Sequence, residues 1–167
     1  MKNLRCTCRY LLGVALVAAI TCSDPDHIVS SNHQTSSCNG FSSLQKRAVV
    51  PYERDLTEYC SAEKIRWTYV AAEKKLSLLH TRRFWNCAAK VKMVVKKRGE
   101  VYTMVETDER DPRGGAACSC PFDTYCEVDG VEPGIITLAL DTLQWRLELD
   151  AVAGMVVIDS SGNLMCE

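Results

Sequence analysis

The 167-residue sequence lacks the motifs of the common enzyme classes. It has no Gly-X-Ser-X-Gly nucleophile motif, no His-Glu-X-X-His zinc motif and no glycine-rich phosphate loop. Histidine is scarce, with three in the chain, and only His80 lies outside a polar N-terminal tract. Because one histidine cannot build a multi-histidine metal centre, we expect a non-enzymatic protein with no cofactor and no metal.

Two further absences concern partners and fold. The formal net charge is −1, so the chain has no excess of positive charge for binding nucleic acid. No segment has a long helical period, and there is no internal repeat. The apolar run Leu11–Ile20 is too short to span a bilayer. We therefore expect no nucleic-acid partner and a domain built of strands.

The apolar run follows the basic residues Lys2, Arg5 and Arg9, which is the pattern of a secretory signal peptide. We place this signal at residues 1–21. The sequence predicts export, and an exported chain meets an oxidising environment in which disulfides form.

Two cleavage positions are open. Cleavage after Ala19 would release a secreted protein, whereas cleavage before Cys22 would leave that cysteine to carry lipid. Ala19-Ile20-Thr21-Cys22 resembles a bacterial lipobox, although Thr21 is larger than the usual residue. We favour lipidation of Cys22, which makes the membrane a partner through a lipid anchor. The protein would then face an envelope or extracellular partner that the sequence leaves unidentified.

Ten cysteines are a high number for this length, and in an exported chain they indicate disulfides. Loss of Cys6 and Cys8 with the signal leaves eight, and acylation of Cys22 leaves seven, so at least one should be unpaired or bonded to another chain. Cys38 either ties the N-terminal tract to the domain or is the odd thiol. The disulfide candidates are Cys60, Cys87, Cys118, Cys120, Cys126 and Cys166.

Residues 22–48 are rich in Ser, Asn, Asp and Gln, with no hydrophobic period, and we interpret them as a flexible polar tether. His27 and His33 lie in this tract, where two histidines are more often linker than metal ligands. From residue 49 the chain becomes apolar, and residues 49–167 should form one domain.

Short alternating segments separated by turn residues dominate that domain. A turn at Lys97–Glu100 should join two of them into a hairpin. This pattern predicts an all-β fold, an antiparallel β-sandwich of immunoglobulin-like or similar type. The expected strands are Ile65–Val70, Leu76–His80, Ala89–Lys96, Val101–Glu106, Cys118–Val128, Ile135–Leu140, Leu143–Leu149, Met155–Ile158 and Leu164–Glu167.

Cys118 and Cys120 are two residues apart. In a strand their side chains point the same way, ~6.6 Å apart along the chain, which is too wide for an unstrained bond between them. Each should therefore have a partner elsewhere, or both should face one ligand. Cys87, at the turn into an expected strand, is the natural candidate.

The stretch from Leu76 to Leu138 carries His80, then Asn86-Cys87, Glu106 and Cys118-Ser-Cys120-Pro-Phe-Asp123. It resembles a group of uncharacterised bacterial lipoproteins and secreted proteins. Their pattern has a histidine, an Asn-Cys-Cys, a glutamate and a Cys-X-Cys-X-Cys-X-aromatic-Asp run. The resemblance marks a candidate functional cluster, which is His80, Asn86, Glu106 and Asp123.

The chain departs from that pattern at two positions. The second cysteine of the Asn-Cys-Cys is Ala88 here, and the first of the later three is Ala116. The resemblance implies that these two cysteines bond each other in relatives, so that losing both strands no thiol. Cys87 would keep its own bridge to Cys118 or Cys120.

Three interpretations of the cysteines compete. In the first they are structural staples, and His80, Glu106 and Asp123 support the turns. In the second, Cys87, Cys118 and Cys120 join His80 in a soft-ligand metal site. In the third they exchange disulfides, although no thioredoxin-like pattern accompanies them. We favour staples, because a cysteine in a disulfide is not available as a thiolate ligand. We therefore expect an exported surface or periplasmic binding or structural module, with a metal-binding or thiol-active envelope protein as the alternative.

Overall fold

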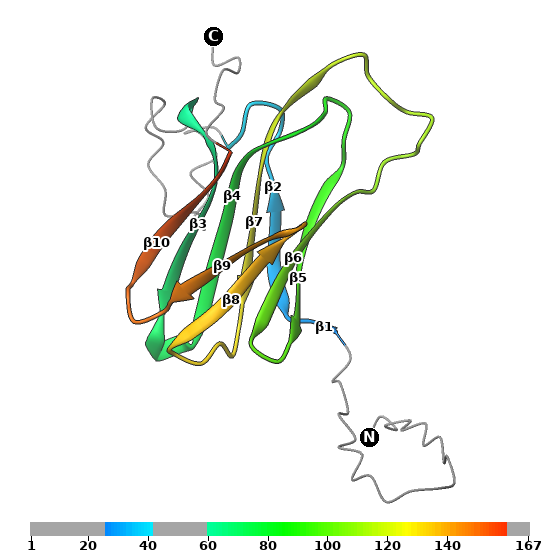
Figure 1. The fold of residues 1–167 in the computed structure, drawn as a ribbon. Helices are drawn as coiled ribbons and strands as arrows, with labels where there is room; N and C mark the ends of the chain where they lie inside the picture. Colours follow the sequence, from blue (N-terminus) through cyan, green and yellow to red (C-terminus); the bar gives the residue numbers. More distant parts are fainter. Residues whose placement is uncertain (1–25, 42–59, 160–167) are drawn as a thin grey trace, which may run out of the picture.

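The computed structural model describes residues 26–41 and 60–159, which form a two-layer β-sandwich (Figure 1). One sheet has the strand order β1-β5-β6-β8-β9, and the other has the order β10-β3-β4-β7-β2. The strands are β1 (His27–Ile28), β2 (Ser30–Thr35), β3 (Glu63–Val70), β4 (Lys75–Asn86), β5 (Val91–Arg98), β6 (Val101–Asp108), β7 (Ser119–Val128), β8 (Ile135–Leu140), β9 (Leu143–Glu148) and β10 (Ala153–Asp159). The predicted all-β sandwich is confirmed.

Alternating side chains build the core between the two sheets. On β3, Ile65, Trp67 and Tyr69 are buried at every second position, as a strand with one buried face requires. Trp67 lies against the backbone of Gly154 on β10, where an added Cβ would come within 2.5 Å of the indole ring. This glycine is therefore needed for the close packing of β10 on β3.

The predicted hairpin is present as β5 and β6, which pair antiparallel. Arg98 pairs with Val101 across a two-residue turn, and Gly99 has a φ of +57° that suits glycine. One pair differs from the rest, because β6 and β8 run parallel. The 3-10 helix η1 (Ala71–Glu73) joins β3 and β4, and no helix among residues 26–41 and 60–159 is long and apolar enough to cross a membrane.

The expected tether needs a correction over residues 26–41, because this segment belongs to the sandwich. β1 pairs with β5, and β2 pairs with β7 at the edge of its sheet. The strand is polar because hydrogen bonds hold it instead of burial: Asn32 donates to the Glu127 carboxylate, and Thr35 donates to the Val91 carbonyl. Hydrophobic periodicity could not reveal such an edge strand. The rest of residues 1–59 and the expected strand at 164–167 lie outside the described residues.

A β-bulge interrupts β4. His80 pairs with Thr124 and Arg83 pairs with Phe122, so β4 has one residue more than β7 across this interval. Arg82 within the bulge has a φ of +65°. Directly paired residues point to the same side of a sheet, and the bulge therefore brings Arg83 to the inward side already occupied by His80.

Candidate functional site

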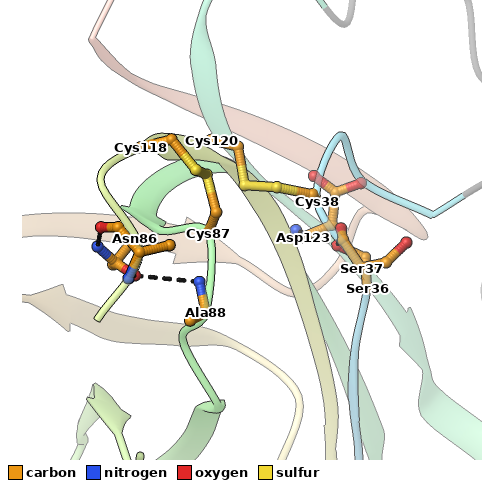
Figure 2. Close-up of a disulfide and its surroundings, with 10 residues drawn as sticks. Ser36, Ser37, Cys38, Asn86, Cys87, Ala88, Cys118, Cys120 and Asp123 are labelled. Atoms are coloured by element: carbon orange, nitrogen blue, oxygen red, sulfur yellow. Dashed lines mark hydrogen bonds between the residues drawn. A yellow bond between two sulfur atoms is a disulfide. The ribbon is translucent and has the colours of Figure 1, made fainter. Parts of the chain in front are cut away.

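Two disulfides lie side by side where β4 ends and β7 begins (Figure 2). Cys87, which was expected to pair with Cys118 or Cys120, is bonded to Cys118, with a Cα–Cα distance of 5.6 Å. Cys38 is bonded to Cys120, also with 5.6 Å between Cα atoms, and so ties the segment after β2 to β7. Stable disulfides fit an oxidising compartment.

The remaining candidates divide into three cases. Cys60 is also disulfide-bonded, whereas Cys22 and Cys166 lie outside the described residues. Cys126, predicted to form a bridge, is instead a free and fully buried thiol. Its inward position on β7 gives it no cysteine partner within the described core. Burial, with Glu106 nearby, raises the pKa of Cys126 to about 12, so this thiol is chemically inert near neutral pH.

A small apolar cluster surrounds the two bridges. Val91, Cys120 and Phe122 are buried there, and Trp85 and Cys87 pack against them. The sulfur atoms of Cys38, Cys87 and Cys120 all lie within 4.8 Å of one another. Thiolates around a tetrahedral zinc ion are roughly 3.8 Å apart. These sulfurs could thus reach one soft metal ion only after reduction, because a disulfide offers no thiolate.

Asn86 holds the backbone beside the Cys87–Cys118 disulfide, which we call the outer bridge, with Cys38–Cys120 as the inner bridge. Its Oδ1 atom accepts hydrogen bonds from the N–H groups of Ala88 and Ala116, both at 3.0 Å, and its Nδ2 group donates to the Ala116 carbonyl at 2.6 Å. Positions 88 and 116 therefore lie next to the same side chain. This proximity supports the hypothesis that cysteines at these two positions would bond each other.

Asp123 fixes the β4 bulge. Its carboxylate accepts hydrogen bonds from the backbone N–H groups of Arg82 and Phe41, each at 3.0 Å. The Asp123 N–H in turn donates to Ser36 Oγ at 2.8 Å. The residue is 3% exposed. Its contacts join β4, β7 and the segment after β2. Its contacts are those of a structural support.

His80 lies between two carboxylates inside the sandwich. Its Nδ1 atom is 3.0 Å from Glu106 Oε1 on the opposite sheet, and its Nε2 atom is 2.9 Å from Glu63 Oε1 on β3. Thr124 donates to the same Glu106 oxygen at 2.5 Å. The imidazole is fully buried, and the Glu106 side chain is 2% exposed. Both ring nitrogens can donate at once only when the histidine is protonated.

Electrostatics favour the charged forms of His80 and Glu106. Burial disfavours the imidazolium, but the Glu106 and Glu63 carboxylates outweigh it and raise the pKa of His80 to about 9. Burial likewise pushes the pKa of Glu106 upward, yet the positive charge of His80 holds it below its ordinary value. The group is an ion pair across the core, which joins the two sheets.

Arg83 connects the buried ion pairs of His80 to the surface. It lies 3.7 Å from Glu63 and 3.8 Å from Glu106, and it donates to Asp141 at 2.9 Å. No pattern in the sequence marks Arg83, Glu63 or Asp141 as site residues. The alternation of β4 places His80 inward and Arg83 outward, and only the bulge reverses that placement.

The structure thus brings together only part of the predicted cluster. His80 and Glu106 are in direct contact, whereas Asn86 supports the outer bridge and Asp123 supports the bulge. Comparison with protein-family models, curated proteins and solved structures finds no match for the chain. The resemblance to bacterial lipoproteins therefore stays a prediction.

Proposed function

We propose that the protein is an exported, lipid-anchored β-sandwich that acts as a non-enzymatic binding or structural module of the bacterial cell envelope. The observation that carries the proposal is the pair of adjacent disulfides, Cys38–Cys120 and Cys87–Cys118. Disulfides persist in oxidising compartments and are rare in the cytosol. The signal-like N-terminus, with Cys22 directly after it, supplies the route and the anchor.

Three of the four side chains of the candidate cluster, those of His80, Asp123 and Asn86, support a scaffold. Both nitrogens of His80 face carboxylates, both oxygens of Asp123 accept backbone hydrogen bonds, and both polar atoms of Asn86 bind backbone. Catalytic groups need free hydrogen-bonding capacity toward a substrate. These side chains are already used in holding strands and loops together, which favours a recognition or structural role.

Metal binding or thiol chemistry at Cys87, Cys118 and Cys120 is the second candidate, and the closeness of the sulfur atoms of Cys87 and Cys120 to each other and to that of Cys38 favours it. One elemental analysis distinguishes the two proposed functions. The scaffold predicts no stoichiometric zinc or copper in protein purified without reductant. About one metal ion per chain, lost when Cys118 and Cys120 are replaced, would favour the metal site.

Cell fractionation tests the anchor. In a bacterial host, the unmodified chain should collect with membranes, and Cys22→Ala should release the protein into the soluble exported fraction. Cys126→Ala is the matched control, because it removes a buried thiol without touching the anchor. A mature N-terminus at Ile20 without lipid would contradict lipidation and leave simple secretion.

A further inference from the structure

The two disulfides differ in how they meet solvent and each other. Cys87 Sγ lies within 4.8 Å of the sulfurs of both Cys38 and Cys120, and Cys118 Sγ lies outside this three-sulfur set. Cys118 is exposed, Cys87 and Cys38 are half-buried, and Cys120 is buried. The outer bridge therefore has one end in solvent and its other end against the inner bridge. Figure 2 shows the two bridges side by side.

This arrangement matches the geometry of stepwise thiol–disulfide exchange. A thiolate attacks one sulfur of a disulfide, and the other sulfur leaves as a thiolate. Attack from solvent is directed by access to Cys118, so that the leaving group is Cys87. The new thiolate is then next to the inner bridge, which is itself an electrophile.

We propose that the outer bridge is a thiol-exchange site, and that its cleavage by an external thiol leads to cleavage of the inner bridge. In the first step a low-molecular-weight thiolate attacks Cys118 Sγ, the Cys87–Cys118 bond breaks, and a mixed disulfide forms on Cys118. In the second step the Cys87 thiolate attacks Cys120 Sγ, the Cys38–Cys120 bond breaks, and Cys38 leaves as a thiolate, which takes a proton from solvent. The second step moves no net electrons, because one disulfide replaces another.

Burial decides which inner sulfur leaves. Thiolates leave more readily when water stabilises their charge, and Cys38 is half-buried whereas Cys120 is 8% exposed and packed among apolar side chains. Attack on Cys120 therefore expels Cys38. The product, a Cys87–Cys120 bridge, still links β4 to β7. The segment after β2 then has no disulfide to β7, so an external thiol would remove the covalent link at this edge of the sandwich. This activity goes beyond the proposed scaffold role.

The full chain carrying Cys118→Ala tests the second step, because Cys87 has lost its disulfide partner and starts as a free thiol. The variant is incubated with catalytic glutathione, quenched with acid, alkylated after denaturation and mapped by non-reducing peptide mass spectrometry. We expect a Cys87–Cys120 peptide and alkylated Cys38 in at least a tenth of the molecules. Cys87→Ala is the matched control, because its free Cys118 lies outside the three-sulfur set. In this variant we expect alkylated Cys118 and an intact Cys38–Cys120 bridge.

The unmodified protein tests the first step and remains informative if a variant fails to fold. With excess oxidised and reduced glutathione, the mixed disulfide should form on Cys118, while buried Cys126 stays unmodified under native conditions. Three outcomes would each overturn the proposal: alkylation of Cys87 without alkylation of Cys38 in the Cys118→Ala variant, equal exchange in Cys87→Ala, or glutathione attached to Cys87 instead of Cys118 in the unmodified protein.

Discussion

The buried His80 predicts a specific loss of stability at alkaline pH. The pKa of His80 is about 9 in the folded chain, against 6.5 for an unperturbed histidine. Below pH 6.5 both folded and unfolded chains hold the proton, and the ion pairs contribute fully. Between the two values only the folded chain holds it, so the stability that His80 contributes falls as pH rises and is lost above about pH 9.

The size of the effect follows from the same two values. One pKa unit corresponds to about 1.4 kcal/mol, so the free energy of unfolding should fall by about 1.4 kcal/mol per pH unit, and by on the order of 3 kcal/mol in total. In the unfolded chain Cys126 and Tyr125 ionise near their ordinary pKa values of 9.0 and 10.0, whereas in the folded chain their pKa values are raised to about 12, so their own loss of stability begins only at the alkaline end of this window. The opposing loss on acidification comes from Glu106, whose pKa is lowered.

Urea denaturation without reductant, followed by tryptophan fluorescence from pH 6 to 8.5, measures this slope. His80→Gln should abolish it, and where that variant unfolds, His80→Gln combined with Glu106→Gln removes both charges. His33→Gln is the matched control, because it replaces an exposed histidine on β2. A flat profile in the unmodified protein, or a slope that survives the loss of His80, would refute the assignment of a charged buried histidine.

Three further outcomes test the disulfide end and the bulge. Cys87→Ala opens a loop of 31 residues, which should cost ~3–4 kcal/mol of unfolding free energy and lower the melting temperature; an unchanged melting temperature would show that the bridge does not stabilise the fold. Cysteines introduced together at Ala88 and Ala116 should form an additional bridge, seen as a two-hydrogen mass loss, whereas two free thiols in folded protein would reject the paired-loss hypothesis. Asp123→Asn should lower stability by ~1–3 kcal/mol in urea, because an amide replaces a carboxylate that accepts two backbone hydrogen bonds; an unchanged midpoint would mean that Asp123 is not a support.

Local pattern was enough to locate the strands of the domain but not its polar edge. Ile135–Leu140 is both the expected segment and the observed β8, because its apolar run and flanking turns are explicit in the sequence. β2 is not predicted by the sequence pattern because its residues are polar. It is stabilised by pairing with β7, by side-chain hydrogen bonds and by the Cys38 bridge. Those partners are distant in sequence, and no local period records them.

The candidate site was predictable only in part for the same reason. The contact between His80 and Glu106 spans two sheets, and the resemblance marked both residues without placing them together. Simple alternation places Arg83 on the outward side, and only the bulge turns it inward. The bulge in turn is held by the Asp123 carboxylate. Cys126 was assigned to a bridge because cysteine count alone cannot distinguish a buried thiol from a paired one.

Non-reducing peptide mass spectrometry of the protein purified from bacterial membranes reports the lipid anchor and the disulfides together. We expect linked peptides for Cys38–Cys120 and Cys87–Cys118, an unpaired Cys126, and a lipid-modified N-terminal peptide beginning at Cys22. Reduced cysteines at positions 38, 87, 118 and 120 would contradict the exported, disulfide-stapled module that we propose.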